Sequence, residues 1–267
     1  TGGEPLMHPD FLEIVSYIKD KGFVLFLKTN GTLITDNNVV IIKKYVDQVI
    51  LTRYGCSKKI YEKNTKVKGS YDRYVNALSL LQTNKIPYKE NAVLLKDNEE
   101  ELAELLESTS MLDAYITATC ENPYATAHRP SDAALYEYYK RTLAKLTIGK
   151  YEGIVEERPV CNCCTCSLTI NSNGTINPCT NFYYSLGESK RQALRDIWFS
   201  KGKQHIIESC KFKNFKKCIS CPNKKYLLSL APCNNYTETN DVNDISEEMC
   251  RHCFILKQVC EDMENVI

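Results

Sequence analysis

Residues 1–34 read TGGEPLMHPDFLEIVSYIKDKGFVLFLKTNGTLI. A helix is predicted over 10–21, because its apolar residues recur at intervals of three and four and Gly22 follows where a left-handed helix end favours glycine. The apolar run 24–27 then predicts a buried strand, and the polar loop 29–31 ends it. A loop, a helix, a strand and a further loop in this order are typical of a parallel sheet with crossover helices.

The alternation of helix and strand continues along the first 118 residues. Stretches with apolar residues at helical spacing alternate with short apolar or β-branched runs. The further helices are predicted near 36–46, 71–78 and 102–106, and the further strands near 49–51, 88–95 and 112–117. Together with the strand at 24–27, these segments predict an α/β domain whose sheet has at least four strands.

The loops that follow the strands are the candidates for a binding site, because ligands of parallel α/β sheets bind beyond the carboxyl ends of the strands. Adjacent glycines at Gly2 and Gly3 let a backbone approach a ligand closely. The carboxylate of Glu4 can accept charge-assisted hydrogen bonds from an ammonium group. Taken alone, the same motif is also compatible with an ordinary tight turn and a solvated carboxylate. The three candidate loops are 2–5, 29–31 and 53–55.

Charge and hydropathy exclude several classes of partner. The 267 residues include 34 basic and 33 acidic side chains, a formal net charge of +1, with the two signs interspersed. No field of one sign therefore indicates binding to nucleic acid or to an anionic membrane surface. No apolar run approaches the length of a membrane span, and the first ten residues lack the pattern of a signal peptide. We expect a globular protein located in the cytoplasm.

Cysteine is concentrated in the last two-fifths of the sequence. Twelve of the fourteen cysteines lie between Cys161 and Cys260. In a reducing compartment such clustering indicates thiolate ligands of a metal or cluster, whereas structural disulfides are the alternative for a secreted chain. The two outlying cysteines, Cys56 and Cys120, are interpreted as small buried hydrophobic residues.

The order of the N-terminal motifs resembles the radical S-adenosylmethionine (SAM) superfamily over about residues 1–118. The matching segments are TGGEP, LMHPDFLEIVSYIKDKGF, LKTNGTLI, VILTRYG and KVKGSYDRYVNALSLL. The resemblance implies a (β/α) barrel that binds SAM, with the Gly-Gly-Glu loop on the methionyl amino group and the other residues on the nucleoside side. At Arg53 the chain departs from the pattern, since many relatives have Ser there. The cofactor-binding residues implied are Gly2, Gly3, Glu4, Thr29, Asn30 and Tyr54.

One expected motif is missing from these residues. Radical SAM enzymes hold a [4Fe-4S] cluster with a Cys-x3-Cys-x2-Cys loop after the first strand, ahead of the Gly-Gly-Glu loop. That spacing occurs nowhere in the 267 residues, which start at Thr1 in mid-motif. We therefore expect a partial barrel without its first strand and cluster loop, truncated at the N-terminus. The parent protein would generate the 5′-deoxyadenosyl radical, and this chain alone would be inactive.

The Cys-rich region resembles the SPASM extension of radical SAM maturases. The spacings from Cys161 to Gly174 and from Gly174 to Cys179 fit its opening pattern, and a hairpin is predicted around the turn 171–174. Only Cys233 stands where the family has two further cysteines, so the resemblance implies one or two auxiliary [4Fe-4S] clusters, with Cys163, Cys164 and Cys210 as possible additional ligands. The implied ligands are Cys161, Cys166, Cys179, Cys218, Cys221, Cys233, Cys250 and Cys253.

These patterns predict three segments. Residues 1–118 form the partial radical SAM barrel, 119–158 a linker with one helix, and 159–267 a small α+β domain of the SPASM type. Zinc is the chief rival for the cysteines, because two Cys-x2-Cys pairs are suited to a tetrahedral thiolate site. The spacing alone favours zinc, and the adjoining barrel favours iron and sulfur.

The resemblance implies a peptide maturase that abstracts a hydrogen atom from a peptide or protein substrate and installs an oxidative crosslink such as a thioether. A reductant such as flavodoxin or ferredoxin is the expected second partner. Relatives also modify enzymes or make small cofactors, and the sequence does not separate these substrates. The alternative is a non-catalytic module that binds a peptide and is stabilised by zinc.

Overall fold

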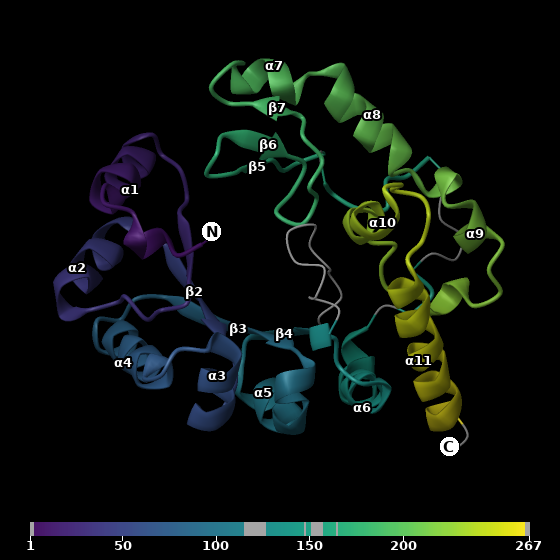
Figure 1. The fold of residues 1–267 in the computed structure, drawn as a ribbon, viewed down its shortest axis with the longest axis horizontal. Helices are drawn as coiled ribbons and strands as arrows, with labels where there is room; N and C mark the ends of the chain where they lie inside the picture. Colours follow the sequence, from purple (N-terminus) through teal and green to yellow (C-terminus); the bar gives the residue numbers. More distant parts are fainter. Residues whose placement is uncertain (1–2, 115–126, 147, 151–156, 164, 265–267) are drawn as a thin grey trace. The chain divides into compact units, whose positions relative to one another are not determined.

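A computed structural model of the chain describes residues 3–114, 127–146, 148–150, 157–163 and 165–264. The chain divides into two compact units, Thr1–Tyr115 and Ile116–Ile267. Each unit is described by itself (Figure 1). The separate linker over 119–158 stays a prediction.

The first unit is a four-stranded parallel sheet in the order β1-β2-β3-β4. Helical segments alternate with the strands along the chain, so the predicted α/β alternation is confirmed. The strands are β1 (Phe26–Thr29), β2 (Gln48–Arg53), β3 (Tyr88–Leu94) and β4 (Met111–Ala114). The helical segments are η1 (Pro5–Met7), α1 (Phe11–Asp20), α2 (Asp36–Tyr45), α3 (Lys58–Thr65), α4 (Ser70–Thr83), η2 (Lys96–Glu101) and α5 (Leu102–Ser108).

Helices pack against one face of this sheet. Leu27, Val49 and Leu51 point to that face and form a core with apolar residues of α2, α3 and α4. Figure 1 shows α1 to α5 along the same side of the strands. Because successive residues of a strand point to opposite faces, the residues between these positions line the other face. One face of the sheet therefore belongs to the helix-side core, and the other carries the intervening residues of the strands.

The structure differs from the sequence prediction in two places within this unit. Strand β1 begins at Phe26 rather than at residue 24 and ends at Thr29, and it is buried only at alternate residues rather than throughout. Helix α3 is not predicted from the sequence, because its segment KKIYEKNT has only two buried residues, Ile60 and Tyr61. The hydroxyl of Ser57 caps this helix by accepting a hydrogen bond from the backbone N–H of Ile60. Of the predicted strand 112–117, residues 115–117 lie outside the described part.

Gly31 shapes the loop after β1. Its φ of +77° lies in the left-handed region, and a Cβ atom there would lie 2.8 Å from Cδ2 of Leu51. A side chain would thus meet both backbone strain and a clash with the core. The glycine allows the loop to turn directly over the end of the sheet, which brings Asn30 next to Glu4.

The second unit is an α+β assembly around a small antiparallel sheet, β5-β6-β7. The predicted hairpin is confirmed, with Thr169 opposite Asn177. The strands are β5 (Thr169–Ile170), β6 (Thr175–Asn177) and β7 (Gly187–Glu188). The helical segments are α6 (Asp132–Thr142), η4 (Leu143–Lys145), α7 (Leu194–Trp198), α8 (Lys201–Ser209), η5 (Phe212–Asn214), α9 (Lys216–Ile219), η6 (Lys224–Tyr226), α10 (Pro232–Thr239) and α11 (Glu247–Glu264).

A buried polar network fixes α11 within this unit. The Glu248 side chain is 4% exposed and lies within ion-pair distance of Arg129, Arg251 and His252. His252 also hydrogen-bonds to the hydroxyl of Tyr139 on α6. Burial would raise the pKa of Glu248, but the hydrogen bond with His252 and the two arginine charges lower it. The network thus holds the helix that carries Cys250 and Cys253.

No helix among the described residues has the length and apolar character to cross a bilayer.

Candidate cofactor sites

Glu4 connects the first loop to the loop that follows β1. Its Oε1 accepts hydrogen bonds from the Thr29 hydroxyl at 2.7 Å and the Leu6 N–H at 3.1 Å. Its Oε2 accepts one from the Asn30 N–H at 2.9 Å. A carboxylate offers about four lone-pair positions, so these three bonds leave about one for an external donor. The half-buried carboxylate is therefore fixed in place and still able to bind an ammonium group.

The loop after β1 is itself fixed by short hydrogen bonds. The Thr29 hydroxyl accepts from the Gly31 N–H at 3.0 Å, and the Asn30 side chain accepts from the Thr32 N–H at 2.9 Å. Gly3 has a φ of +63° and borders open space, since a Cβ atom added there would have no atom within 4 Å. The structure thus brings Gly3, Glu4, Thr29 and Asn30 together, as the sequence predicts, whereas Gly2 lies outside the described residues.

Tyr54 is electrostatically linked to the same loop. It follows β2 directly and packs edge-on against Tyr61 with ring centroids 5.7 Å apart. Burial, and then the charge of Glu4, raise the pKa of its hydroxyl. Tyr54 therefore lies within the electrostatic reach of the Glu4 carboxylate, and its place in a SAM site stays a prediction.

Arg53 contacts the helix side of the sheet. Its Nη1 lies 3.2 Å from Oε2 of Glu90, and the same carboxylate oxygen accepts a hydrogen bond from the Tyr74 hydroxyl. The side chains of Arg53 and Glu90 are 13% and 14% exposed. The ion pair with Glu90 explains how the chain accommodates a charged side chain at this largely buried position. Sequence analysis missed Glu90 and Tyr74, because nothing in their local sequence marks them as partners of Arg53.

Most cysteines of the second unit form two sets, here called the first and the second thiol group. In the first, the Sγ atoms of Cys163 and Cys210 are 4.0 Å apart, and the Cys163 N–H donates to Sγ of Cys161 at 3.4 Å. All members of this group pack in one apolar cluster with Phe182. The first thiol group consists of Cys161, Cys163, Cys179, Cys210 and Cys233.

The second thiol group joins the two Cys-x2-Cys pairs. Cys218 interacts electrostatically with each of the other three cysteines, which come from the segment after α9 and from α11. The pairs are 29 residues or more apart in the chain, so only the fold brings them together. The second thiol group consists of Cys218, Cys221, Cys250 and Cys253.

The structure groups three cysteines differently from the predicted ligand set, while the ligand roles themselves stay predictions. The structure does not bring Cys166 to either group: it is exposed, and its Sγ lies 3.6 Å from the carbonyl oxygen of Asn162. Cys163 and Cys210, which the sequence left as additional ligands, lie within the first group instead. Cys120 and Cys164 lie outside the described residues, and the buried environment expected for Cys56 is confirmed.

Several members of the thiol groups would need a nearby cation to become thiolates at neutral pH. Burial, the largest cause, raises the pKa of Cys218 and of Cys233 to about 12 and that of Cys253 to about 11. Cys161 differs, because hydrogen bonding from Cys163 lowers its pKa to about 6. Neutral buried thiols must release protons when they bind a metal. Among the described residues, no three or more His, Cys, Asp or Glu side chains are arranged so that they could hold a metal ion.

The donor chemistry nevertheless fits iron and sulfur. Each group provides at least four thiols, the number that holds a [4Fe-4S] cluster. Four thiols also satisfy zinc, so the donor set alone leaves that alternative open. None of the described cysteines forms a disulfide.

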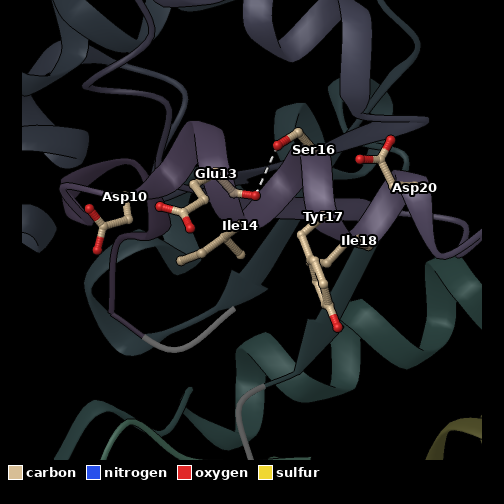
Figure 2. A pocket seen from close by; sticks show the side chains of 7 residues that line it. All are labelled: Asp10, Glu13, Ile14, Ser16, Tyr17, Ile18 and Asp20. Carbon is tan, nitrogen blue, oxygen red and sulfur yellow. Dashed lines mark hydrogen bonds between the residues drawn. The ribbon is translucent and has the colours of Figure 1, made fainter.

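Two cavities lie elsewhere. One of about 460 Å3 runs along α1 and is lined by carboxylates of Asp10, Glu13 and Asp20 next to Ile14 and Tyr17 (Figure 2). The other, of about 710 Å3, lies in the second unit between α6, η6 and α11. Neither includes a residue of the Glu4 loop or a member of the two thiol groups, so the candidate sites rest on those clusters rather than on these cavities.

Comparison with known proteins identifies the class. Residues 1–109 match the radical SAM superfamily, and residues 161–222 match the SPASM iron-sulfur cluster-binding domain. Residues 1–109 therefore form a radical SAM domain, and residues 161–222 form a SPASM domain. The cofactors of this combination are SAM with a [4Fe-4S] cluster and auxiliary [4Fe-4S] clusters.

Individual relatives are distant. An AdoMet-dependent heme synthase of Methanosarcina barkeri is 24% identical over 85% of this chain and 77% of its own length. The structure of anSMEcpe with bound AdoMet and Cp18Cys peptide superposes with a TM-score of 0.69 at 14% identity, covering 100% of this chain and 85% of that one. The structure of Streptococcus suis SuiB bound to precursor peptide SuiA superposes with a TM-score of 0.68 at 19% identity, covering 93% of this chain and 64% of that one. These structures establish the shared fold.

The role of Glu4 is testable by substitution. Glu4→Gln is expected to weaken SAM binding roughly tenfold to a hundredfold, because a hydrogen bond to a charged group contributes about 1.5–3 kcal/mol. Equilibrium dialysis with labelled SAM measures the change, and circular dichroism confirms folding. Glu13→Gln, which neutralises an exposed carboxylate on α1, is the matched control. Equal affinity of both variants and the unaltered protein would remove Glu4 from the site.

Proposed function

We propose that the protein is a peptide maturase of the radical SAM/SPASM type, which oxidatively modifies a peptide or protein substrate by a thioether or comparable crosslink. The observation that carries the proposal is the assembly, in one chain, of the Glu4 loop and two groups of at least four thiols. When bound, SAM and the clusters supply hydrogen-atom abstraction and electron transfer. The anSMEcpe and SuiB structures described above both contain bound peptides.

In this proposal the chain's own residues bind and orient SAM and the auxiliary clusters. Glu4 holds the methionyl ammonium group, while Thr29 and Asn30 hold Glu4 in position. The first and second thiol groups each hold an auxiliary cluster, whose burial and neighbouring hydrogen bonds set its potential. A flavodoxin or ferredoxin is the proposed reductant.

Two alternative functions are each favoured by one observation. A small-molecule substrate is favoured by the match to the heme synthase of M. barkeri, which extends over 85% of this chain. A non-catalytic module that binds a peptide is favoured by the two Cys-x2-Cys pairs of the second thiol group, which also suit zinc.

The proposal is tested by anaerobic turnover. Because residues 1–267 contain no Cys-x3-Cys-x2-Cys spacing, the assay uses the protein extended by such a loop and reconstituted with iron and sulfide. It is incubated with SAM, a reductant and peptides encoded beside its gene. Mass spectrometry is expected to detect 5′-deoxyadenosine and a peptide that has lost hydrogen. Formation of 5′-deoxyadenosine with every peptide unchanged would reject the peptide substrate.

A further inference from the structure

The sheet face opposite the helices carries a row of two lysines. Lys28 on β1 pairs in register with Ile50 on β2, and Ile50 pairs with Lys89 on β3. Residues in register on neighbouring parallel strands point to the same face. Leu27, Val49 and Leu51 pack toward the helices, so the alternation directs Lys28, Ile50 and Lys89 to the opposite face.

The dimensions of the row follow from sheet geometry. Neighbouring strands are about 4.8 Å apart, so the backbones at Lys28 and Lys89 are separated by roughly 10 Å. Both lysines are exposed, whereas Ile50 between them is half-buried. The row therefore presents an apolar strip between two flexible cations.

Neither lysine has an ion-pair partner among the described side chains. Other cations of this unit do: Arg53 pairs with Glu90 on the helix side, and Lys19 pairs with Asp47 at the surface. Two unpaired cations on one face raise the local potential for an anion. Within the described residues the two lysines therefore remain available to pair with an anionic ligand.

The row also adjoins the candidate SAM site. Lys28 directly precedes Thr29, whose hydroxyl donates to Glu4. On the same face, Thr52 and Asn91 form the next row toward the carboxyl ends of the strands, since they pair in register. A substrate on this face would contact the two lysines. Thr52 and Asn91 lie one row nearer to the strand ends, where the Glu4 loop is found.

We propose that Lys28 and Lys89 select a peptide substrate with acidic side chains, a specificity that rests on the proposed function and extends it. An extended peptide directs alternate side chains to one side about 6.8 Å apart. Two Glu residues in the pattern Glu-x-Glu can therefore reach both flexible ammonium groups while the peptide backbone crosses Ile50.

Binding is measured without turnover, on the 267-residue chain. The probe is the capped peptide Gly-Glu-Gly-Glu-Gly with a neutral methoxycoumarin label, followed by fluorescence anisotropy at low salt. The comparison peptide has Gln in place of both Glu residues. We expect the acidic peptide to bind roughly tenfold more tightly, and the difference to shrink in about 0.5 M salt (on the order of a 4 Å screening length), because exposed ion pairs are weak and screened.

Variants identify the residues responsible. Lys28→Gln/Lys89→Gln is expected to abolish the preference, and Lys28→Glu/Lys89→Glu to reverse it toward a peptide with Lys in place of Glu. Lys43→Gln/Lys59→Gln, which removes two exposed lysines of α2 and α3, should leave the preference intact. Circular dichroism verifies that each variant folds.

Three results would overturn the proposal. One is an equal affinity for acidic and amide peptides. Another is binding of adipate as tightly as the acidic peptide, with displacement of that peptide, which would assign the row to small dicarboxylates. The third is a loss of SAM binding in the double Gln variant with the peptide preference unchanged, which would assign the lysines to the cofactor. None of these measurements depends on catalysis, so a failed turnover assay and a failed specificity assay remain distinguishable.

Discussion

The double variant Cys218→Ser/Cys250→Ser is expected to halve the iron content of the anaerobically reconstituted protein, from about eight to about four atoms per chain. The reason is that these residues belong to the second thiol group, where Cys218 interacts with the three other thiols. Loss of two of four thiolate ligands leaves too few for a [4Fe-4S] cluster. Iron and sulfide assays measure the change.

The reciprocal variant tests the first thiol group. Cys179→Ser/Cys233→Ser should remove the other half of the iron and leave the second cluster in place. Two single variants serve as controls: Cys56→Ser alters a buried thiol of the first unit, and Cys166→Ser alters an exposed thiol that the structure brings to neither group. Both controls should retain all iron. A loss of iron in Cys166→Ser would restore this cysteine as a ligand and contradict the grouping.

Glu90→Ala is expected to lower the free energy of unfolding of the first unit by about 3 kcal/mol, because it removes one partner of a buried ion pair. Arg53 would keep its charge in a site where its side chain is 13% exposed, and the Tyr74 hydroxyl would lose its acceptor. Urea denaturation, monitored by circular dichroism, measures the change.

Two further variants distinguish the contribution of the ion pair to stability from that of any substitution in strand β3. Lys89→Ala changes the neighbouring exposed residue of β3 and should shift stability by no more than about 0.5 kcal/mol. Arg53→Met/Glu90→Leu removes both charges and should be less destabilised than Glu90→Ala, since no unpaired charge is left. Equal stability of Glu90→Ala and Lys89→Ala would show that the pair contributes little.

The sequence predicted the order of helices and strands in the first unit well, because apolar spacing reports which residues face a core. It also assigned the Glu4 loop and the loop after β1 to one binding edge, and the hydrogen bond from the Asn30 N–H to Glu4 shows that the two loops meet. Helix α3 escaped prediction because its stability comes from the packing of two residues and a Ser57 cap, which leave little periodic signal.

Most contacts between residues far apart in the sequence could not be predicted. The Arg53–Glu90 ion pair joins residues 37 positions apart, and only the strand register places them together. In the Cys-rich unit, spacing identified both Cys-x2-Cys pairs and suggested that they share one thiolate site, but it did not identify the members of the first thiol group. Spacing also favoured Cys166 over Cys163 and Cys210, because the distance along the chain does not report which thiols face the apolar cluster around Phe182.

The most direct test of the central claim is the metal content of the chain itself. The 267 residues are produced without oxygen, and iron, sulfide and zinc are measured together with the visible absorption spectrum. Two thiol groups that hold [4Fe-4S] clusters predict a brown protein with about eight irons and about eight sulfides per chain and little zinc. A colourless protein with stoichiometric zinc would contradict the account and favour the non-catalytic module.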